Sequence, residues 1–253
     1  MVTLHRVSDV DDLIFQAALK FIETIAGIQA GNGGLHGDGV ARVVLTGGGA
    51  GIGLLHELAR LDFAAQQQGE NYPALRIDWS RVHIFFGDER NVPVSDPASN
   101  EGQARSALLD HVDIPNQNIH GFDLGAVSME AAANAYEPEL KDFAPLGFDL
   151  HLLGMGAEGH INSMFPHSPA IREREELAVP VHDSPKPPSE RITLTLAAVN
   201  RSERVWLLVA GEEKAAAAKN IVDGVDAEEC PAAGAQGTKE TILFLADDAA
   251  QEL

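Results

Sequence analysis

Cysteine is almost absent from this chain: Cys230 is the one cysteine among 253 residues, so no internal disulfide can form. Residues 1–6 lack the apolar core of a secretory signal peptide, and no apolar run approaches the length of a membrane-spanning helix. These features are typical of a cytoplasmic protein, and we expect that location with no membrane partner. Glu228 and Glu229 precede Cys230, and their charges should raise its pKa, so we expect a structural thiol rather than a nucleophile.

Basic residues are also scarce. The chain carries 18 Lys and Arg against 38 Asp and Glu, which gives a formal net charge of −20. This excess argues against nucleic acid and anionic membranes as partners, because both would be repelled. A site for an anionic ligand would therefore need cations gathered locally against the field of the whole chain.

What the chain does contain is an alternation of helix-like and strand-like segments. Apolar spacing predicts helices over 10–28, 52–68, 100–111, 128–143 and 212–222, with a short helix near the C-terminus. Apolar and β-branched runs predict strands over 42–45, 82–86, 148–153, 178–181, 192–196, 205–209 and 242–246. We expect Ser8 and Ser99 to cap the first and third helices, Pro138 to kink or split the fourth, and a Gly-rich loop over 31–39. The pattern predicts an α/β fold, a mostly parallel sheet flanked by helices on both faces, in a single domain over residues 1–253.

Three glycines, Gly47, Gly48 and Gly49, follow the predicted strand 42–45 and lead toward a helix. Backbone N–H groups at such a turn, together with a helix N-terminus, form an anion site. The segment 46–53 also matches the nucleotide loop of short-chain dehydrogenases. The long helix before it and the lack of a Tyr-x-x-x-Lys pair argue against that interpretation. For the glycines alone, a tight turn without a ligand is an equally simple interpretation.

Polar side chains also follow the predicted strand 82–86. Asp88 and Arg90 come directly after it, and Asn100 begins the next predicted helix. A guanidinium can hold phosphate or carboxylate in a bidentate manner, and a carboxylate can bind sugar hydroxyls. Because parallel strands end at one edge of a sheet, we expect these residues near the glycine loop. A solvated loop is the alternative.

His160 and Glu158 lie on a glycine-rich turn directly after the predicted strand 148–153. The chain has ten histidines, and His160 stands out because glycines surround it at a strand end. An imidazole in this position is suited to acid–base chemistry, and a nearby carboxylate can orient it. A structural histidine is the alternative.

Two further cations stand at the starts of predicted elements. Arg191 precedes the strand 192–196, and Lys214 lies in the first turn of the helix 212–222. A lysine is disfavoured there by the helix macrodipole, and an anionic ligand would offset that cost. The alternative for Lys214 is a surface ion pair with Glu212 or Glu213.

In their order along the chain, these motifs resemble the glucosamine-6-phosphate isomerase/6-phosphogluconolactonase family. The matching pieces cover nearly the whole sequence: Gly47–Gly49, Asp88-Glu89-Arg90, Val92-Pro93, Ser99-Asn100, Phe148-Asp149-Leu150, Leu153-Gly154-Met155-Gly156, Gly159-His160, Ser163-Met164-Phe165-Pro166, Arg191-Ile192-Thr193, and Gly211 with Lys214. The chain departs from the family pattern twice. The usual Ser-Gly-Gly-Ser-Thr-Pro loop is Thr46-Gly47-Gly48-Gly49-Ala50-Gly51, which loses hydroxyl donors but keeps the backbone amides. The usual Asp two residues before the histidine is Glu158.

The resemblance implies a Rossmann-like fold of the sugar-phosphate isomerase/deaminase type. It implies hydrolysis of 6-phospho-D-glucono-1,5-lactone in the oxidative pentose phosphate pathway, without a metal or organic cofactor. It implies that His160 is the general base, with Glu158 as the second catalytic residue. The substrate-binding residues it implies are Gly47, Gly48, Gly49, Asp88, Arg90, Asn100, Arg191 and Lys214. The expected partner is a phosphorylated sugar lactone, and the expected state is a monomer or small homo-oligomer.

Two related functions are the alternatives. Glucosamine-6-phosphate deaminase shares the fold and a Gly-His loop, but it carries Phe-Asn-Glu-Pro soon after the histidine. This chain has Ser163-Met164-Phe165-Pro166 there, without a glutamate. A non-catalytic sugar-phosphate-binding module of a transcription regulator would need a DNA-binding segment, which we do not expect at this length and charge.

Overall fold

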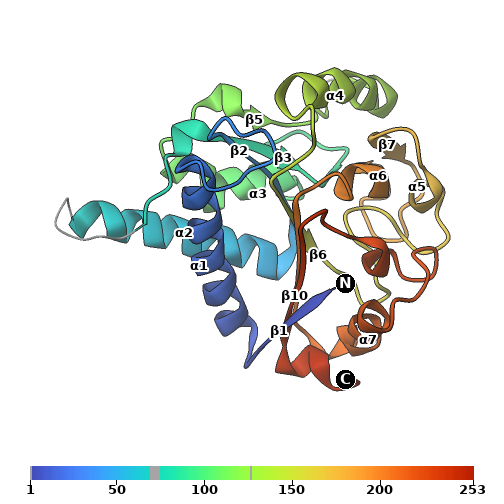
Figure 1. Ribbon diagram of the computed structural model, residues 1–253. Helices are drawn as coiled ribbons and strands as arrows, with labels where there is room; N and C mark the ends of the chain where they lie inside the picture. Colours follow the sequence, from blue (N-terminus) through green and yellow to red (C-terminus); the bar gives the residue numbers. More distant parts are fainter. Residues whose placement is uncertain (1, 69–74, 126) are drawn as a thin grey trace.

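The computed structural model describes residues 2–68, 75–125 and 127–253 and contains a seven-stranded, wholly parallel sheet (Figure 1). The strand order is β1-β10-β9-β6-β2-β3-β5. The strands are β1 (Thr3–Val7), β2 (Ala41–Leu45), β3 (Val82–Phe86), β5 (Ile119–His120), β6 (Leu150–Gly154), β9 (Arg204–Val209) and β10 (Glu240–Ala246). The predicted α/β fold is confirmed.

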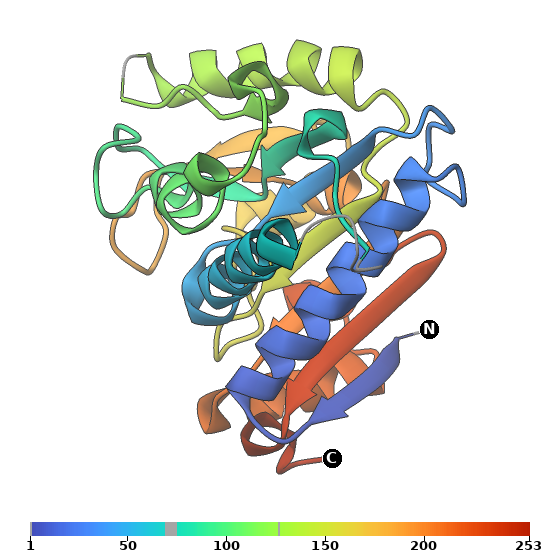
Figure 2. The same cartoon turned by 90° about the vertical axis from the view of Figure 1, so that its left-hand side faces the viewer.

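Helices cover both faces of this sheet, as Figures 1 and 2 show. The main helices are α1 (Val10–Gln29), α2 (Gly48–Gln68), α3 (Asn100–Ala107), α4 (Met129–Phe143) and α7 (Ala215–Asp223), with short helices α5 (Pro169–Arg172) and α6 (Leu196–Val199). Alternate residues of β9 enter two separate cores: Trp206 packs on the side of α1 and α2, and Leu207 packs on the side of α7. Burial on both faces explains why these strands are continuous apolar runs in the sequence. None of the helices among the described residues is long and apolar enough to cross a membrane.

A smaller antiparallel sheet, which the sequence does not predict, stands beside the large one. It has the order β4-β8-β7 and consists of β4 (Asp88–Arg90), β8 (Arg191–Leu194) and β7 (Ala178–Val181). The chain passes from β3 into β4 through Gly87, which donates to the Leu45 carbonyl of one sheet and accepts from the Leu194 N–H of the other. The sequence predicts a loop at Asp88–Arg90, because three charged residues favour no strand. Pairing with β8 overrides that preference.

Two predicted helix starts are wrong. Asp9, not Ser8, is the N-cap of α1, and its carboxylate accepts a bond of 2.9 Å from the Asp12 N–H. Helix α2 begins at Gly48 instead of residue 52, so the glycine loop forms its first turn. Glycine is a poor helix former, which favours a helix that begins after the glycines. The helix nevertheless begins at Gly48, because close packing in its first turn requires glycine. A β-carbon at Gly51 would lie 2.6 Å from the Thr46 carbonyl oxygen.

Other differences concern where elements are interrupted. Helix α4 is not split at Pro138, because Tyr136 and Leu140 on either side of it are buried and hold the helix in place. The predicted helix 100–111 ends at Ala107, and a 3-10 turn (Leu109–His111) follows. The predicted helix 212–222 begins as a 3-10 turn (Glu212–Lys214). Strand β1 has four exposed residues of five and strand β5 only two residues in all, so neither gives a clear apolar signal.

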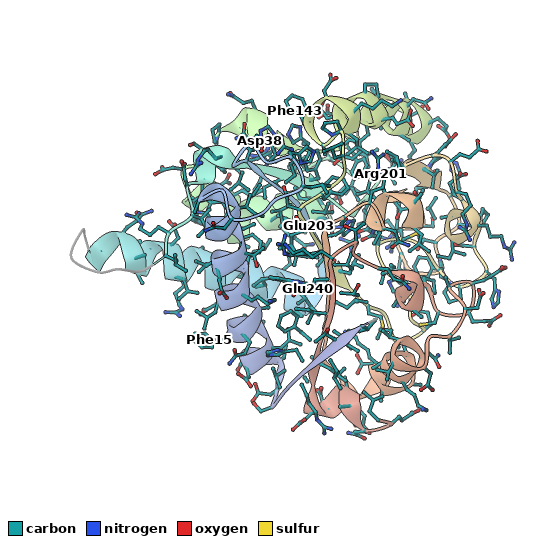
Figure 3. All side chains as sticks on the ribbon, viewed as in Figure 1. Phe15, Asp38, Phe143, Arg201, Glu203 and Glu240 are labelled. Carbon is teal, nitrogen blue, oxygen red and sulfur yellow. The ribbon has the colours of Figure 1, made fainter. Side chains whose placement is uncertain are left out.

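The Gly-rich loop 31–39 lies at the amino ends of β2 and β6. Asp149, which is fully buried, accepts from the Leu35 N–H at 2.6 Å and the Arg42 N–H at 2.8 Å and so ties the loop to both strands. The Arg42 side chain in turn donates to the Asp38 carboxylate and to the Phe143 carbonyl; both of these residues are labelled in Figure 3. The loop therefore occupies the edge opposite the one where the predicted site residues follow their strands.

We predict that Asp149→Ala lowers the free energy of unfolding by about 2–4 kcal/mol, because it removes two charge-assisted bonds to buried N–H groups. Urea denaturation measures this change. The control is Asp142→Ala, an exposed carboxylate in α4, for which we expect a change within about 0.5 kcal/mol. Equal stability of the two variants would show that Asp149 does not hold the loop.

Candidate active site

The predicted site residues other than Arg191 follow four neighbouring strands of the large sheet, β3, β2, β6 and β9, and Arg191 is the first residue of β8 in the smaller sheet. Their carboxyl ends surround a cavity of about 470 Å³, a size suited to a small ligand. The predicted residues that line it are Gly47, Gly48, Gly49, Asp88, Arg90, Asn100, His160, Arg191 and Lys214. Glu158 contacts His160 from outside the lining. The structure thus gathers the whole predicted set, whose individual roles remain predictions.

The cavity is cationic although the chain is strongly acidic. Four of the 18 Lys and Arg residues line it, against two of the 38 Asp and Glu residues. The four are Arg90, Lys186, Arg191 and Lys214. Cations gathered against the field of the chain favour an anionic ligand at this position.

The glycine loop presents the N-terminus of α2 to the cavity. Gly48 has φ +80°, a left-handed conformation that glycine adopts without strain. A β-carbon at Gly47 would lie 2.3 Å from Asn100 Oδ1, so glycine is needed for the close approach of α3. The free N–H groups and the dipole of a helix N-terminus together stabilise an anion.

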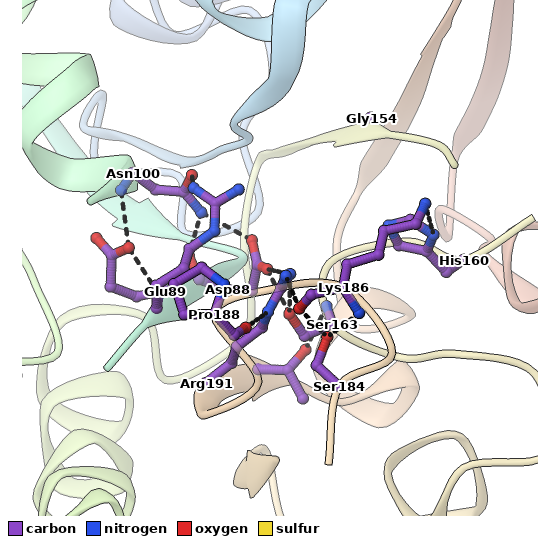
Figure 4. A network of polar contacts seen from close by, with 12 residues as sticks. Asp88, Glu89, Asn100, Gly154, His160, Ser163, Ser184, Lys186, Pro188 and Arg191 are labelled. Carbon is purple, nitrogen blue, oxygen red and sulfur yellow. Dashed lines mark hydrogen bonds and ion pairs between the residues drawn. The ribbon is translucent and has the colours of Figure 1, made fainter. Parts of the chain in front are cut away.

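Two consecutive buried carboxylates organise the segments around β4 (Figure 4). Asp88 accepts from Ser163 Oγ at 2.6 Å and from Asn100 Nδ2 at 2.9 Å. Glu89 accepts from the N–H groups of Arg90, Asn100 and Glu101 and from Ser99 Oγ. Burial raises the pKa of Glu89, although these four donors oppose the shift. Ser99 caps α3 as predicted, since its Oγ accepts from the Gly102 N–H at 3.0 Å.

Arg90 and Arg191 are direct partners in the antiparallel pairing of β4 and β8. Burial lowers the pKa of Arg191, and the charge of Arg90 adds to this shift while Asp88 opposes it. Like charges placed opposite one another across a sheet destabilise it. An anion bound in the cavity would relieve this repulsion.

The His160 turn depends on close packing around the imidazole. A β-carbon at Gly156 would lie 2.1 Å from two atoms of the ring, and the Gly156 N–H donates to the His160 carbonyl at 3.0 Å. Gly159 has φ +85°, and its α-carbon faces Cys230 Sγ. On its other side the imidazole stacks on Phe165, with ring centroids 4.4 Å apart. Cys230 is buried, and burial raises the pKa of its thiol. The direction is the one expected from the sequence, but the cause is burial and not the charges of Glu228 and Glu229.

Glu158 and Lys186 both contact the imidazole of His160. Glu158 Oε1 lies 3.1 Å from His160 Nδ1, and Lys186 Nζ lies 3.1 Å from Glu158 Oε2 and 3.5 Å from His160 Nδ1. Burial lowers the pKa of His160 below its ordinary 6.5; Glu158 opposes this and Lys186 reinforces it. Burial alone would raise the pKa of Glu158, but its own backbone N–H, His160 and Lys186 together lower it. Both shifts favour the neutral imidazole and the charged carboxylate.

Lys186 belongs to none of the motifs in the sequence. Its one signal is a lone lysine among prolines in the segment 184–188 of an acidic chain. Arg191 brings it to the site, because the guanidinium donates to the carbonyls of Lys186 at 2.8 Å and Pro188 at 2.9 Å. Most N–H donors of Arg191 thus bond to atoms of the protein, so Arg191 positions the segment 184–188.

Lys214 remains available to a ligand. It lies at the start of α7 and lines the cavity, and it forms no ion pair within the described part of the chain. The alternative pairing with Glu212 or Glu213 is therefore not observed. A partly buried cation at a helix N-terminus is unfavourable unless an anion accompanies it.

A wholly parallel sheet with a cationic cavity at its carboxyl edge defines the class: an α/β protein built to hold a small anionic ligand. Residues 8–244 match the family model described as glucosamine-6-phosphate isomerases/6-phosphogluconolactonase, and the chain belongs to that family. A Mycobacterium tuberculosis protein named 6-phosphogluconolactonase is 47% identical over 97% of this chain and 96% of its own. The crystal structure of 6-phosphogluconolactonase from Thermotoga maritima has a TM-score of 0.80 and 26% identity, over 98% of this chain and 100% of its own. A monomeric glucosamine-6-phosphate deaminase, at 20% identity over 100% of this chain and 100% of its own, shares the fold with a TM-score of 0.80.

We predict opposite pH shifts for two variants at His160. Lys186→Met removes a positive charge that disfavours the imidazolium, so the His160 pKa should rise. Glu158→Gln removes a negative charge that favours it, so the pKa should fall further below 6.5. A general base acts only above its pKa, so with His160 as the predicted base the acid limb of the kcat/KM profile should move to higher pH for Lys186→Met and to lower pH for Glu158→Gln. A profile with the same midpoint in both variants and the wild type would contradict this arrangement.

Proposed function

We propose that the protein hydrolyses 6-phospho-D-glucono-1,5-lactone to 6-phospho-D-gluconate, a step of the oxidative pentose phosphate pathway, in the cytoplasm. The observation that carries the proposal is an imidazole, held by a carboxylate, in the wall of a cavity lined by four cations. The identity with the M. tuberculosis 6-phosphogluconolactonase supports the choice of substrate. The family also includes deaminases, so the lactone is a proposal that an assay must separate from an amino sugar.

The phosphate group is assigned to the glycine loop and Lys214. The N-terminus of α2 supplies backbone N–H groups, and Lys214 supplies a charge without a carboxylate partner among the described residues. Arg90 and Arg191 add positive potential from β4 and β8. Asp88 and Asn100 hold these segments together and present oxygen and nitrogen atoms toward the sugar.

His160 is assigned the role of general base. Glu158 occupies its Nδ1, which leaves Nε2 to take a proton from water as the water oxygen bonds to C1 of the lactone. The tetrahedral oxyanion then collapses, the bond between C1 and the ring oxygen breaks, and the imidazolium returns its proton to that oxygen. The new carboxylic acid releases one proton to solvent at neutral pH.

This chemistry needs no metal or organic cofactor in the proposed step. A δ-lactone is an activated ester, and a positioned general base contributes about 10²–10⁴-fold. The cations of the cavity stabilise the oxyanion as it forms. The burial that lowers the His160 pKa favours the unprotonated base.

The test of the function is proton release from freshly prepared 6-phosphogluconolactone, which purified protein should accelerate well above buffer. The same protein should release no ammonia from glucosamine 6-phosphate. Ammonia release would favour the deaminase. A lactone rate equal to buffer, together with binding of 6-phosphogluconate, would favour a non-catalytic sugar-phosphate-binding module.

Two variants should separate the chemical step from binding. His160→Ala removes the base, so kcat should fall by about 10²–10⁴-fold while calorimetry still detects 6-phosphogluconate binding. Lys214→Ala is the matched comparison: loss of a phosphate contact should mainly raise KM and leave kcat close to wild type. An active His160→Ala variant, or a Lys214→Ala defect confined to kcat, would contradict these assignments.

A further inference from the structure

Asn162 has a strained backbone directly beside the His160 turn. Its φ is +50°, and it is the second residue of a turn that the Met164 N–H closes by donating to the Ile161 carbonyl at 3.0 Å. Asn tolerates this conformation better than most residues, but glycine adopts it without strain. A strained non-glycine residue beside a functional cavity indicates that its side chain has a use.

The Asn162 side chain is also buried without a hydrogen-bond partner. The residue is 8% exposed, and neither Oδ1 nor Nδ2 is bonded to any described residue. Asn118, which is equally buried, donates to the carbonyls of Ser80 and Val82. Buried polar groups are rarely left unpaired, because their lost hydration is not replaced. Asn162 also lines the cavity, so a ligand bound there can supply the missing partner.

Asn162 lies in the wall of the cavity. Asn162 lines the cavity together with His160, and a β-carbon at Gly87 would lie 2.3 Å from Asn162 Oδ1. Gly87 therefore leaves room for the amide at the junction of β3 and β4. The next residue, Ser163, donates to Asp88 and fixes the turn in place.

We propose that Asn162 is a substrate-binding residue that recognises the hydroxyl on C2 of the lactone, an inference that rests on the proposed function. His160 must lie beside C1 to deliver water, and Asn162 lines the same cavity two residues further along the turn. The ring atoms bonded to C1 are the ring oxygen and C2, and of these two only C2 carries a hydroxyl. An amide donates and accepts, and so does a hydroxyl, so the two groups can satisfy each other. Asn162 would then select 2-hydroxy lactones over 2-deoxy lactones.

The experiment compares wild type with Asn162→Gly on 6-phosphogluconolactone and on its 2-deoxy analogue. Glycine suits the positive φ, so thermal unfolding should show equal or greater stability. Asp123→Gly is the control, because Asp123 has φ +52° and is exposed away from the cavity. We expect Asn162→Gly to lose at least about 10-fold in kcat/KM on the 2-hydroxy substrate, the value of one well-placed hydrogen bond. Its rate on the 2-deoxy analogue should stay near wild type, so that discrimination disappears.

Other results would overturn the inference in distinguishable ways. A stable Asn162→Gly variant with wild-type discrimination would show that Asn162 serves the turn alone, while the proposed function would stand. If Asn162→Gly and Asn162→Ala both fail to fold, the amide is structural and the inference fails. No wild-type hydrolysis of either lactone would remove the proposed function, and the inference with it.

Discussion

Asp88 and Glu89 connect the segments of the site, and the arrangement of the cavity depends on them. Asp88 bonds Ser163 on the turn that carries His160 and Asn100 at the start of α3, and lies 3.9 Å from Arg191 on β8. Glu89 accepts from three N–H groups and one hydroxyl, so the N-terminus of α3 is held against β4. Both carboxylates are more than nine-tenths buried, where an unpaired charge would be strongly unfavourable. Because the partners of Asp88 lie on the His160 turn, in α3 and on β8, its loss would loosen several walls of the cavity together. Loss of Glu89 would release the N-terminus of α3 from β4.

The cations of the cavity repel one another, and this repulsion is the second feature on which the site depends. The chain has a net charge of −20, yet Arg90 and Arg191 face each other across β4 and β8, and Lys214 has no carboxylate partner among the described residues. Such an arrangement is unfavourable in the empty site and is relieved when a dianion enters. Lys186 differs from the other cations because it pairs with Glu158 and lies close to His160. It therefore acts on the pKa of His160, whereas we propose that the other cations act on the ligand.

Sequence reasoning predicts the parallel sheet and the site residues because both depend on local patterns. Apolar runs mark β2, β3, β6 and β9, and the polar residues directly after them meet at one edge in any parallel sheet. The smaller sheet escapes prediction because Asp88–Arg90 becomes a strand only through its pairing with β8. Lys186 escapes because it belongs to no motif, and three bonds from Arg191 to the segment 186–188 place it. Asn162 has no sequence signal, since strain and missing partners are properties of the folded chain.

We propose that Glu158 fixes the tautomer of His160, so that Nε2 is free to act as the base. The distances support it: Nδ1 lies 3.1 Å from the carboxylate and 3.5 Å from the lysine, so Nδ1 donates to Glu158 rather than accepting from Lys186. Nitrogen-15 NMR of the imidazole in the intact protein tests this most directly, because protonated and unprotonated ring nitrogens differ in chemical shift. At neutral pH we predict a proton on Nδ1, an unprotonated Nε2, and a titration midpoint below 6.5. A proton on Nε2 at neutral pH, or an imidazolium that persists above pH 6.5, would contradict the account.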